Sequence, residues 1–488
     1  MGRTDHEQES VFFGDLHSHC NVGYGHGSLE NAYANAALQL DFLAVTPHAH
    51  WHDMPVDDPD LEDLVAYHRM GFKRTADAWE RVREMATEAT VPGEFAAFLA
   101  YEWHSNTYGD HNVYFKNDLG EVFRSGSLED LREEVRGLQR RGGDAFMIPH
   151  HIGYRAGTRG INWDHFSSEF SPVVEAMSMH GCAESAEAPF PYNHTMGPRD
   201  WEGTYQYGLE RGNLVGLIGS TDHHSAHPGS YGHGGLAVWA SELTRDAVFE
   251  AIQSRRCYAI SGDKISLDFA VNGVPMGGVA PADASRFIAV GVEGGSSIDY
   301  IDVLHNNRLI HRWSGQRVDT GLSAGESVKT HFQVGWGKVG VNVDWDVQLE
   351  VIGGELIDVQ PRFRGHSIVA PQQGDEEAYQ FSSWQRVSPS AVRFATRTWG
   401  NVNTTTPGMQ GLSLELEGDE ATLIMVTING QTTEIPLSSL LQGPRTGNIG
   451  GFVSPAFNFS RAVPSGESKA SFEIDHRDAC LLYTSDAA

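Results

Sequence analysis

The chain has little cysteine and little positive charge. Four cysteines occur in 488 residues, without a CxxC pair or a repeated spacing. This pattern indicates neither a disulfide framework nor a cysteine-based zinc site. Lysine and arginine total 35 against 64 aspartates and glutamates, which gives a formal net charge of -29. Because nucleic acids and anionic membranes bind positive surfaces, the charge argues against both as partners and favours a small-molecule substrate.

The sequence also lacks long apolar runs. None approaches the roughly 20 residues of a membrane span, and the first ten residues lack the apolar core of a signal peptide. We therefore expect a soluble, cytoplasmic protein, although a start site set too late would hide a secretion signal. Residues 480–488 do not continue the preceding pattern. They resemble a translated sequencing adapter and are set aside from the fold prediction.

Residues 11–265 alternate apolar strands with amphipathic helices. Helical spacing of apolar residues predicts helices over 29–40 and 61–89. Seven strands are expected, at residues 11–16, 41–46, 95–103, 145–149, 173–178, 214–220 and 257–261. Strands separated in this way by helices predict a parallel sheet, open or closed.

Histidines and carboxylates fall where these strands end. Nineteen of the 24 histidines precede residue 266. The polar residues at or just after strand ends are His17, His19, His48, Glu102, His150, His180, Asp222 and His224. In an α/β barrel these ends share one rim, where active sites form. His17 and His19 are two apart on one strand and share a face, so the pattern predicts a metal site at this rim.

The pattern of apolar and polar residues changes after residue 265. Short alternating runs at 265–271, 286–292, 346–351 and 421–427 are separated by turn residues. This pattern predicts an antiparallel β-sandwich over residues 266–479. Residues 321–340 and 362–379 are expected to be loops. The predicted order is therefore an N-terminal tail over 1–10, a barrel over 11–265 and the β domain.

Five motifs resemble those of the PHP family, named for polymerase and histidinol phosphatase. They are GDLHSH at 14–19, LDFLAVTPH at 40–48, YEW at 101–103, IPHH at 148–151 and GSTDHH at 219–224. The resemblance covers roughly residues 11–265. The chain is most similar to a branch known only as a domain of unknown function, in which a β-rich tail follows the barrel. RRCYAISG at 255–262 resembles the junction in that branch.

The resemblance implies a distorted (β/α)7 barrel with two or three divalent metal ions. By motif, one ion is held by His17, His19, Glu102 and Asp222, with Glu102 bridging to a second ion held by His111 and His150. The family's third site uses His48, His224 and an aspartate. Residues 23–26 stand where that aspartate is expected, and Pro47 replaces a second family aspartate, so His26 is the alternative third ligand. Mixed imidazole and carboxylate ligands suit Zn, Mn or Fe.

This ligand set favours hydrolysis of a phosphate ester. Two ions bridged by a carboxylate can hold a hydroxide, lower its pKa and aim it at phosphorus. Glu102 would take part as the bridge, while His180, His223 and His26 are unranked candidates for the proton donor. Arg155 and Arg159 are expected to grip phosphate oxygens of an anionic substrate.

Two alternatives stay open at this point. The first is metal-dependent hydrolysis of an amide or lactone, although no lysine stands at a strand end to serve as a carboxylated ligand. The second is a non-catalytic protein with a degenerate barrel and a β domain that binds a glycan or a protein partner. The replaced aspartates motivate the second alternative.

Overall fold

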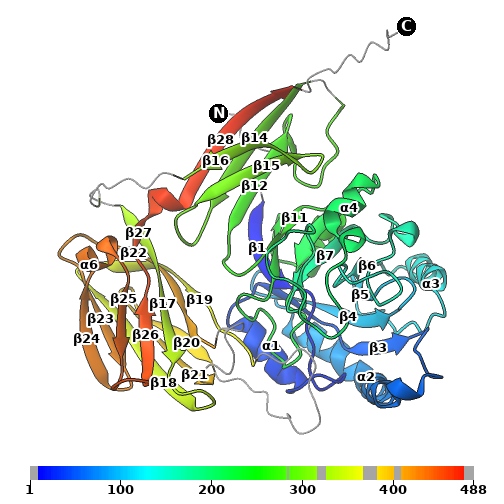
Figure 1. Cartoon of the computed structure of the whole chain (residues 1–488), viewed down its shortest axis with the longest axis horizontal. Coiled ribbons are helices and arrows are strands. Elements are labelled where there is room, and N and C mark those ends of the chain that lie inside the picture. Colours follow the sequence, from blue (N-terminus) through cyan, green and yellow to red (C-terminus); the bar gives the residue numbers. More distant parts are fainter. Residues whose placement is uncertain are drawn as a thin grey trace.

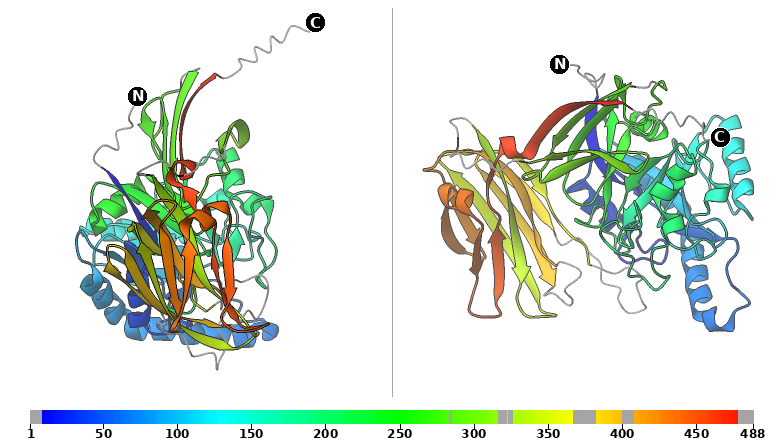
Figure 2. Two further views of the ribbon diagram at one scale, coloured as in Figure 1. Left: turned by 90° about the vertical axis from the view of Figure 1, so that its left-hand side faces the viewer. Right: turned by 45° about the horizontal axis from the view of Figure 1, so that its top comes forward.

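The computed structural model describes residues 9–282, 285–315, 322, 326–366, 382–399 and 408–477. The chain forms a mixed α/β part, a small β unit and a large β-sandwich, seen respectively at the right, top and left of Figure 1. The right-hand view of Figure 2 shows the same separation between the sandwich and the α/β part. Residues 480–488 and most of the predicted tail lie outside the described residues. The boundaries of the predicted domains therefore remain predictions.

All seven expected strands of the α/β part are present, but they are divided between two sheets. A curled eight-stranded sheet has the order β11-β10-β1-β2-β4-β5-β6, with β3 on β4. Its strands are β1 (Ser10–Asp15), β2 (Phe42–Val45), β3 (His48–Trp51), β4 (Ala96–His104), β5 (His111–Phe115), β6 (Ala145–Pro149), β10 (Gly235–Ala240) and β11 (Cys257–Ile260). A separate sheet contains β7 (Val173–Ser178), β8 (Gly181–Cys182) and β9 (Gly216–Gly219). A closed (β/α)7 barrel is thus not confirmed.

The large sheet is mixed rather than parallel. β1, β2 and β4 run parallel, as expected, whereas β5 and β10 pair antiparallel with their neighbours. Only residues 105–110 join β4 to β5. Because a parallel crossover needs about a dozen residues or more, so short a connection forces an antiparallel hairpin. This hairpin decides which side chains of β4 and β5 share a face.

Helices lie on both faces of the curled sheet. Those that pack on its outer face are α1 (Leu29–Ala37), α2 (Glu62–Ala89) and α3 (Leu128–Arg140), whereas α5 (Arg245–Gln253) packs with the inner core. The short helix α4 (Tyr205–Glu210) packs with residues of β7 in the separate sheet. Ser28, Ser127 and Thr244 cap α1, α3 and α5 by accepting a backbone N–H with the side-chain oxygen. Apolar residues of α1, α2 and α3 pack with alternate residues of β2 and β4, such as Leu43 and Leu99. The opposite set of strand residues forms the inner core, and at the strand ends it leads to the polar cluster.

The rest of the chain is antiparallel, as the sequence predicts, but it forms two units. The small unit comprises β12 (Ser266–Val271), β13 (Val274–Pro275), β14 (Ser285–Glu293), β15 (Tyr300–His305), β16 (Arg308–Ser314) and β28 (Lys469–Arg477). One sheet of the sandwich contains β17 (Ser327–Trp336), β19 (Glu355–Pro361), β22 (Gln410–Glu417), β25 (Arg445–Asn448), β26 (Pro455–Phe459) and β27 (Val463–Pro464). The facing sheet contains β18 (Asn342–Ile352), β20 (Ser383–Ser388), β21 (Ala391–Trp399), β23 (Leu423–Ile428) and β24 (Gln431–Pro436), which α6 (Leu437–Gln442) follows. Because β28 returns to β14, the sandwich is an insertion within the small unit.

The expectation of a loop over 321–340 is wrong for β17. Val328, Phe332 and Val334 of this strand are buried in the sandwich core, as period-2 alternation allows. Residues 362–366 form no helix or strand, in line with the prediction, and the remaining residues up to 379 lie outside the described part.

The sandwich contacts the α/β part through residues 362–366 and β20. The backbone N–H of Tyr231 donates to the Phe363 carbonyl at 2.9 Å, and the Trp384 ring N–H donates to the Leu38 carbonyl at 2.9 Å. Within the described residues, the model contains no helix that is long and apolar enough to cross a membrane.

Candidate metal centre

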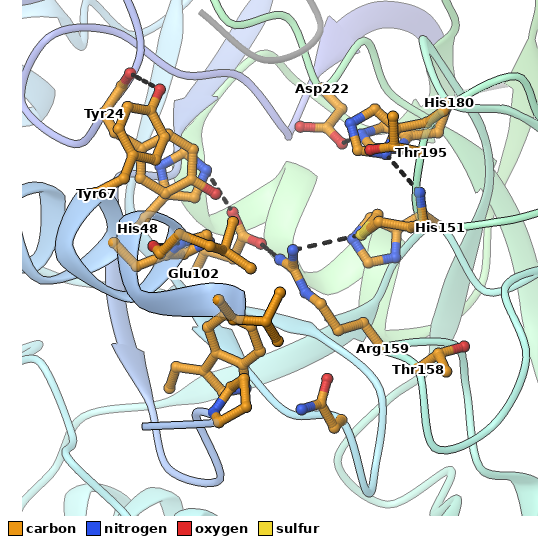
Figure 3. Close-up of a pocket in the computed structure, with 18 of the residues that line it drawn as sticks. Tyr24, His48, Tyr67, Glu102, His151, Thr158, Arg159, His180, Thr195 and Asp222 are labelled. Carbon is orange, nitrogen blue, oxygen red and sulfur yellow. Dashed lines mark hydrogen bonds and ion pairs between the residues drawn. The ribbon is translucent and has the colours of Figure 1, made fainter. Parts of the chain in front are cut away.

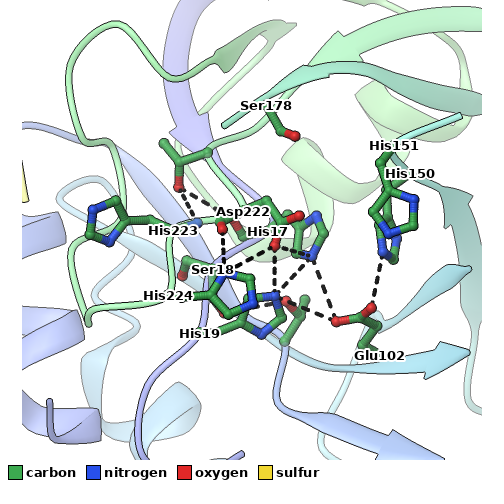
Figure 4. Close-up of polar contacts among 12 residues, drawn as sticks. His17, Ser18, His19, Glu102, His150, His151, Ser178, Asp222, His223 and His224 are labelled. Atoms are coloured by element: carbon green, nitrogen blue, oxygen red, sulfur yellow. Dashed lines mark hydrogen bonds and ion pairs between the residues drawn. The ribbon is translucent and has the colours of Figure 1, made fainter. Parts of the chain in front are cut away.

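Glu102 lies at the centre of a buried polar cluster at the end of β4. Its Oε2 atom lies 3.3 Å from His48 Nε2 and 3.4 Å from His19 Nε2. Its Oε1 atom lies 3.1 Å from His150 Nε2 and 3.1 Å from His104 Nδ1. The two oxygens of one carboxylate therefore face two different sets of imidazoles (Figure 4).

The two histidines that follow β1, His17 and His19, converge on Asp222. Asp222 Oδ1 lies 3.2 Å from His17 Nε2 and 2.9 Å from His19 Nε2. The other ring nitrogen of His17, Nδ1, pairs with Glu175 Oε2 at 2.9 Å. That contact holds the ring so that Nε2 points into the cluster, as partners behind metal-binding histidines commonly do. Asp222 itself has a left-handed backbone with φ +52, a conformation that costs free energy and occurs often at functional sites.

A second set of groups surrounds the Oε1 side of Glu102. Asp110 Oδ2 lies 3.0 Å from His104 Nδ1 and 3.3 Å from His151 Nε2. Arg159 pairs with Asp110 and lies 3.7 Å from Glu102 Oε1. A third set has no carboxylate. It consists of His19, His48 and His224, whose ring nitrogens lie within 4.8 Å of one another.

The spacing and the bonding of these groups fit divalent metal ions. Ligand atoms bound at about 2.1 Å to one ion lie roughly 3.0–3.4 Å apart in octahedral or tetrahedral geometry. Several separations in the cluster fall within that interval, and four groups of three or four such side chains occur among the described residues. Glu102 belongs to three of the four groups. Its buried Oε2 has no hydrogen-bond partner among the described residues, although such atoms are normally paired.

Charge within the cluster shifts the pKa values of its members in opposite directions. Burial alone would raise the pKa of Glu102, but the neighbouring imidazoles of His104 and His48 hold it well below its usual value. Burial would likewise lower the pKa of His17, but Asp222 and Glu175 raise it well above its usual value. Burial lowers the pKa of His150 well below its usual value, so that this imidazole is neutral near pH 7. Carboxylates and neutral imidazoles, such as Glu102 and His150, are the protonation states that bind metals, and the proton that Asp222 and Glu175 favour on His17 would be released when an ion binds.

The cluster opens into a cavity of about 500 Å³. Tyr24, Tyr67, His48 and Glu102 line one side of it, Asp222, His180 and His151 line the other, and the Arg159 guanidinium lies between them (Figure 3). His180 Nε2 lies 3.0 Å from Asp222 Oδ2, and its Nδ1 lies 2.8 Å from the Tyr154 hydroxyl. A bound substrate could therefore lie beside Glu102, Asp222 and the His180 ring.

The structure separates His111 from the predicted ligands. In the β4–β5 hairpin His111 pairs with Trp103, whereas Glu102 pairs with Asn112. Directly paired residues point to the same face of a sheet and successive residues alternate. His111 therefore lies on the outer face, where its Nδ1 is 2.8 Å from the Gly109 carbonyl oxygen. His104, on the same face as Glu102, occupies the place that the sequence assigned to His111.

His223 and Arg155 also lie away from the cavity. The buried ring of His223 points to the side opposite Glu102, as Figure 4 shows, and its Nδ1 accepts from the Ser225 backbone N–H at 3.1 Å. Arg155 is exposed and is not among the cavity-lining residues, whereas Arg159 lines the cavity. His223 and Arg155 thus lie away from the cavity, and their roles as proton donor and phosphate ligand stay predictions that the geometry does not favour, while His180 and Arg159 line the cavity. His26 is buried but belongs to none of the four groups found among the described residues.

Sequence reasoning missed His104, Asp110, His151 and Glu175 as members of the cluster. His104 had a recoverable signal, because it follows Glu102 by two residues on one strand and so shares its face. Asp110 precedes β5 and could be placed only once the hairpin was known. Glu175 lies inside β7, and nothing in its local sequence pairs it with His17.

The architecture is that of a mixed α/β protein with a curled sheet and a histidine and carboxylate cluster at its strand ends. The model of a family described as proteins of unknown function, DUF3604, matches residues 56–158 and 226–298. Uncharacterised proteins of Chlamydia trachomatis and Chlamydia muridarum are each 30% identical over 169 residues, which is 31% of this chain and 27% of theirs. The match thus spans about a quarter of the length of these relatives. A Bacteroides vulgatus crystal structure, described as a two-domain protein containing a predicted PHP-like metal-dependent phosphoesterase, is similar with a TM-score of 0.33 and 11% identity over 88% of this chain and 95% of that one.

Proposed function

We propose that this protein is a metal-dependent phosphoesterase. The observation that carries the proposal is the position of Glu102, whose two oxygens face separate imidazole sets. One carboxylate placed in this way is suited to bridge two ions, the arrangement used by two-metal hydrolases. The PHP-like motifs lie at the same strand ends as this cluster and support the same proposal. His17, His19 and Asp222 would hold one ion, while His150, with His104 or Asp110, would hold the other.

Divalent ions bound in this way would lower the pKa of an attacking water and offset negative charge on the substrate oxygens. The ligand set suits Zn, Mn or Fe. The group of His19, His48 and His224 would hold a third ion without the family aspartate. Tyr24, near the position of that aspartate, instead stacks on His48 with ring centroids 3.4 Å apart.

Arg159 would orient an anionic group in the cavity. Its guanidinium lies beside Asp110 and 5.2 Å above the Trp51 ring, so its position is fixed from two sides. Arginine binds phosphate oxygens with two parallel N–H donors, which selects for a phosphate over a neutral amide or lactone. This charge favours a phosphoesterase over the other metal-dependent hydrolases.

His180 would supply the proton to the leaving oxygen. In its protonated form the ring would carry a proton on each nitrogen, with Nδ1–H donating to the Tyr154 hydroxyl oxygen and Nε2–H facing Asp222. This imidazolium could give its Nε2 proton to the leaving oxygen and become a neutral imidazole. The alcohol would then leave neutral, and a proton from water would restore the imidazolium.

The proposal is tested by metal analysis of the purified chain coupled to a phosphate-ester assay. We expect at least two equivalents of divalent metal, and hydrolysis that a chelator abolishes and added metal restores. His180→Gln should retain the metal and lower kcat by about 10²-fold, as expected for loss of a general acid. Bound metal with hydrolysis of amides but not of phosphate esters would contradict the proposal, as would a folded protein that binds no metal.

A further inference from the structure

One wall of the cavity is apolar and takes no part in the proposed chemistry. It is formed by Trp51 of β3, by Pro55 and by the first turns of α2 with the short 3-10 helix before it, η2 (Pro59–Leu61). The residues from this helical region are Leu61, Leu64, Tyr67 and His68. Their spacing of three and four places them on a single helical face. That face looks into the cavity instead of into the core.

The side chains of this wall are held in place and differ in exposure. Trp51 and His68 are buried, whereas Leu64 is 39% exposed, although it lies on the face that such a helix normally buries. The Trp51 ring N–H donates to Asp53 Oδ1 at 3.0 Å, and the Tyr67 hydroxyl donates to the Tyr24 carbonyl at 3.0 Å. The wall is thus a fixed apolar lining of the cavity in which Leu64 reaches solvent.

The carboxylates Glu102 and Asp222 line another part of the cavity, and Arg159 reaches it with its guanidinium 5.2 Å above the Trp51 ring at the edge of this wall. Arg159 is the only lysine or arginine among the described residues that line the cavity. A ligand that fills the cavity therefore has one anionic end and one end that contacts leucine and aromatic rings. Hydroxyl groups of a polyol at that end would lose water without gaining partners from Leu61, Leu64 or Trp51.

We infer that the substrate is the phosphate monoester of an apolar alcohol, aromatic or aliphatic, whose apolar group lies against Leu61, Leu64 and Trp51. This inference rests on the proposed function and adds the chemical class of the leaving group. In the reaction water attacks phosphorus, the bond between phosphorus and the ester oxygen breaks, and the alcohol and inorganic phosphate are released. The alcohol oxygen takes one proton and the phosphate keeps the oxygen from water.

The test compares binding of benzylphosphonate and methylphosphonate to the metal-loaded full chain by calorimetry. Both carry the same anionic group and neither is hydrolysed. We expect benzylphosphonate to bind at least about tenfold more tightly, since burying a phenyl ring is worth one factor of ten or more. Leu64→Ser should remove most of this preference. Leu119→Ser, at a leucine that is 54% exposed and does not line the cavity, should leave it unchanged.

Equal affinity for the two phosphonates, binding of neither, or the same loss in both serine variants would overturn the inference. A preference that Leu64→Ser abolishes supports it even if no phosphate ester is cleaved, in which case the proposed function alone fails. Hydrolysis of benzyl phosphate and glycerol 3-phosphate with equal kcat/KM would overturn the inference and leave the phosphoesterase proposal standing.

Discussion

Two groups of buried histidines flank the segment that follows β9, and only one of them contains carboxylates. Asp222 and His224 belong to the cluster around Glu102, whereas the adjacent His223 points to the other side and contacts His227 and His233. The ring centroid of His223 lies 6.0 Å from that of His227 and 5.8 Å from that of His233. Both groups are histidine-rich and buried, so burial alone does not distinguish them.

Charge distinguishes the two groups. In the second group, burial lowers the pKa of His227 to about 3 and that of His233 to about 4, and no carboxylate among the described residues opposes this shift. These imidazoles are neutral and pack against residues 362–366, which join the sandwich to the α/β part. A side chain at Gly365 would place its Cβ 2.4 Å from His223 Cε1. The second group therefore serves to join two parts of the fold, and the first, with its carboxylates, is the one suited to metal ions.

The largest effect should follow from removing the central carboxylate. We expect Glu102→Gln to lower kcat/KM for a phosphate ester by about 10³-fold, because the stabilisation supplied by bridged ions amounts to several kcal/mol. Glu250→Gln, at an exposed residue of α5, is the matched control and should leave the rate unchanged. A Glu102→Gln variant with full activity would remove the basis for distinguishing the two groups.

The next effect concerns the two histidines of the β4–β5 hairpin. His104→Gln should weaken metal binding by about 10–100-fold, as expected when a group that binds or orients a metal ligand is lost. His111→Gln should not, since His111 lies on the outer face. Metal titration of both apoproteins checks this, with circular dichroism to verify folding. The reverse ranking would mean that the hairpin register places the wrong histidine at the site.

The two arginines provide a third comparison. Arg159→Met should weaken binding of inorganic phosphate by about 30-fold, the value of one lost charged hydrogen-bonding group, without lowering the metal content. Arg155→Met should change neither, because Arg155 is exposed outside the cavity. Calorimetric titration with phosphate is the measurement. Equal losses of phosphate affinity in the two variants would mean that both arginines act through their charge at a distance. Such a result would contradict a direct contact between Arg159 and the phosphate.

The smallest effect should be a pH dependence of stability due to the second group. The folded-state pKa values of His227 and His233 lie below the ordinary value near 6.5. Above that pH both imidazoles are neutral in the folded and in the unfolded chain, so their ionisation does not change the free energy of unfolding. Between about pH 6.5 and pH 4 the unfolded chain binds protons that the folded chain cannot, and stability falls with falling pH. Between pH 7.5 and pH 5, the Tm of the His227→Gln variant should fall by about 2–4 °C less than the Tm of the wild type. An identical loss in both proteins would contradict the buried neutral state of His227.

The strands could be predicted because local patterns specify them, and apolar runs identified all seven expected strands. Histidines two apart at the end of the first strand predicted His17 and His19 as ligands, and the structure places both in the cluster around Glu102. The hairpin register could not be predicted, because β5 follows a short polar connection that reads as a loop. His111 was misplaced for that reason, and His104 was missed. The opposite directions of His223 and His224 depend on the left-handed backbone at Asp222, which no spacing rule reveals.

The most direct test of the account is anomalous diffraction from crystals of the metal-loaded protein at the absorption edge of the bound metal. The account predicts at least two peaks, one on each side of the Glu102 carboxylate, at about 2.0–2.2 Å from its oxygens and from His17 Nε2 or His150 Nε2. It predicts no peak among His223, His227 and His233. A peak confined to that second group, or no peak near Glu102, would contradict the central claim.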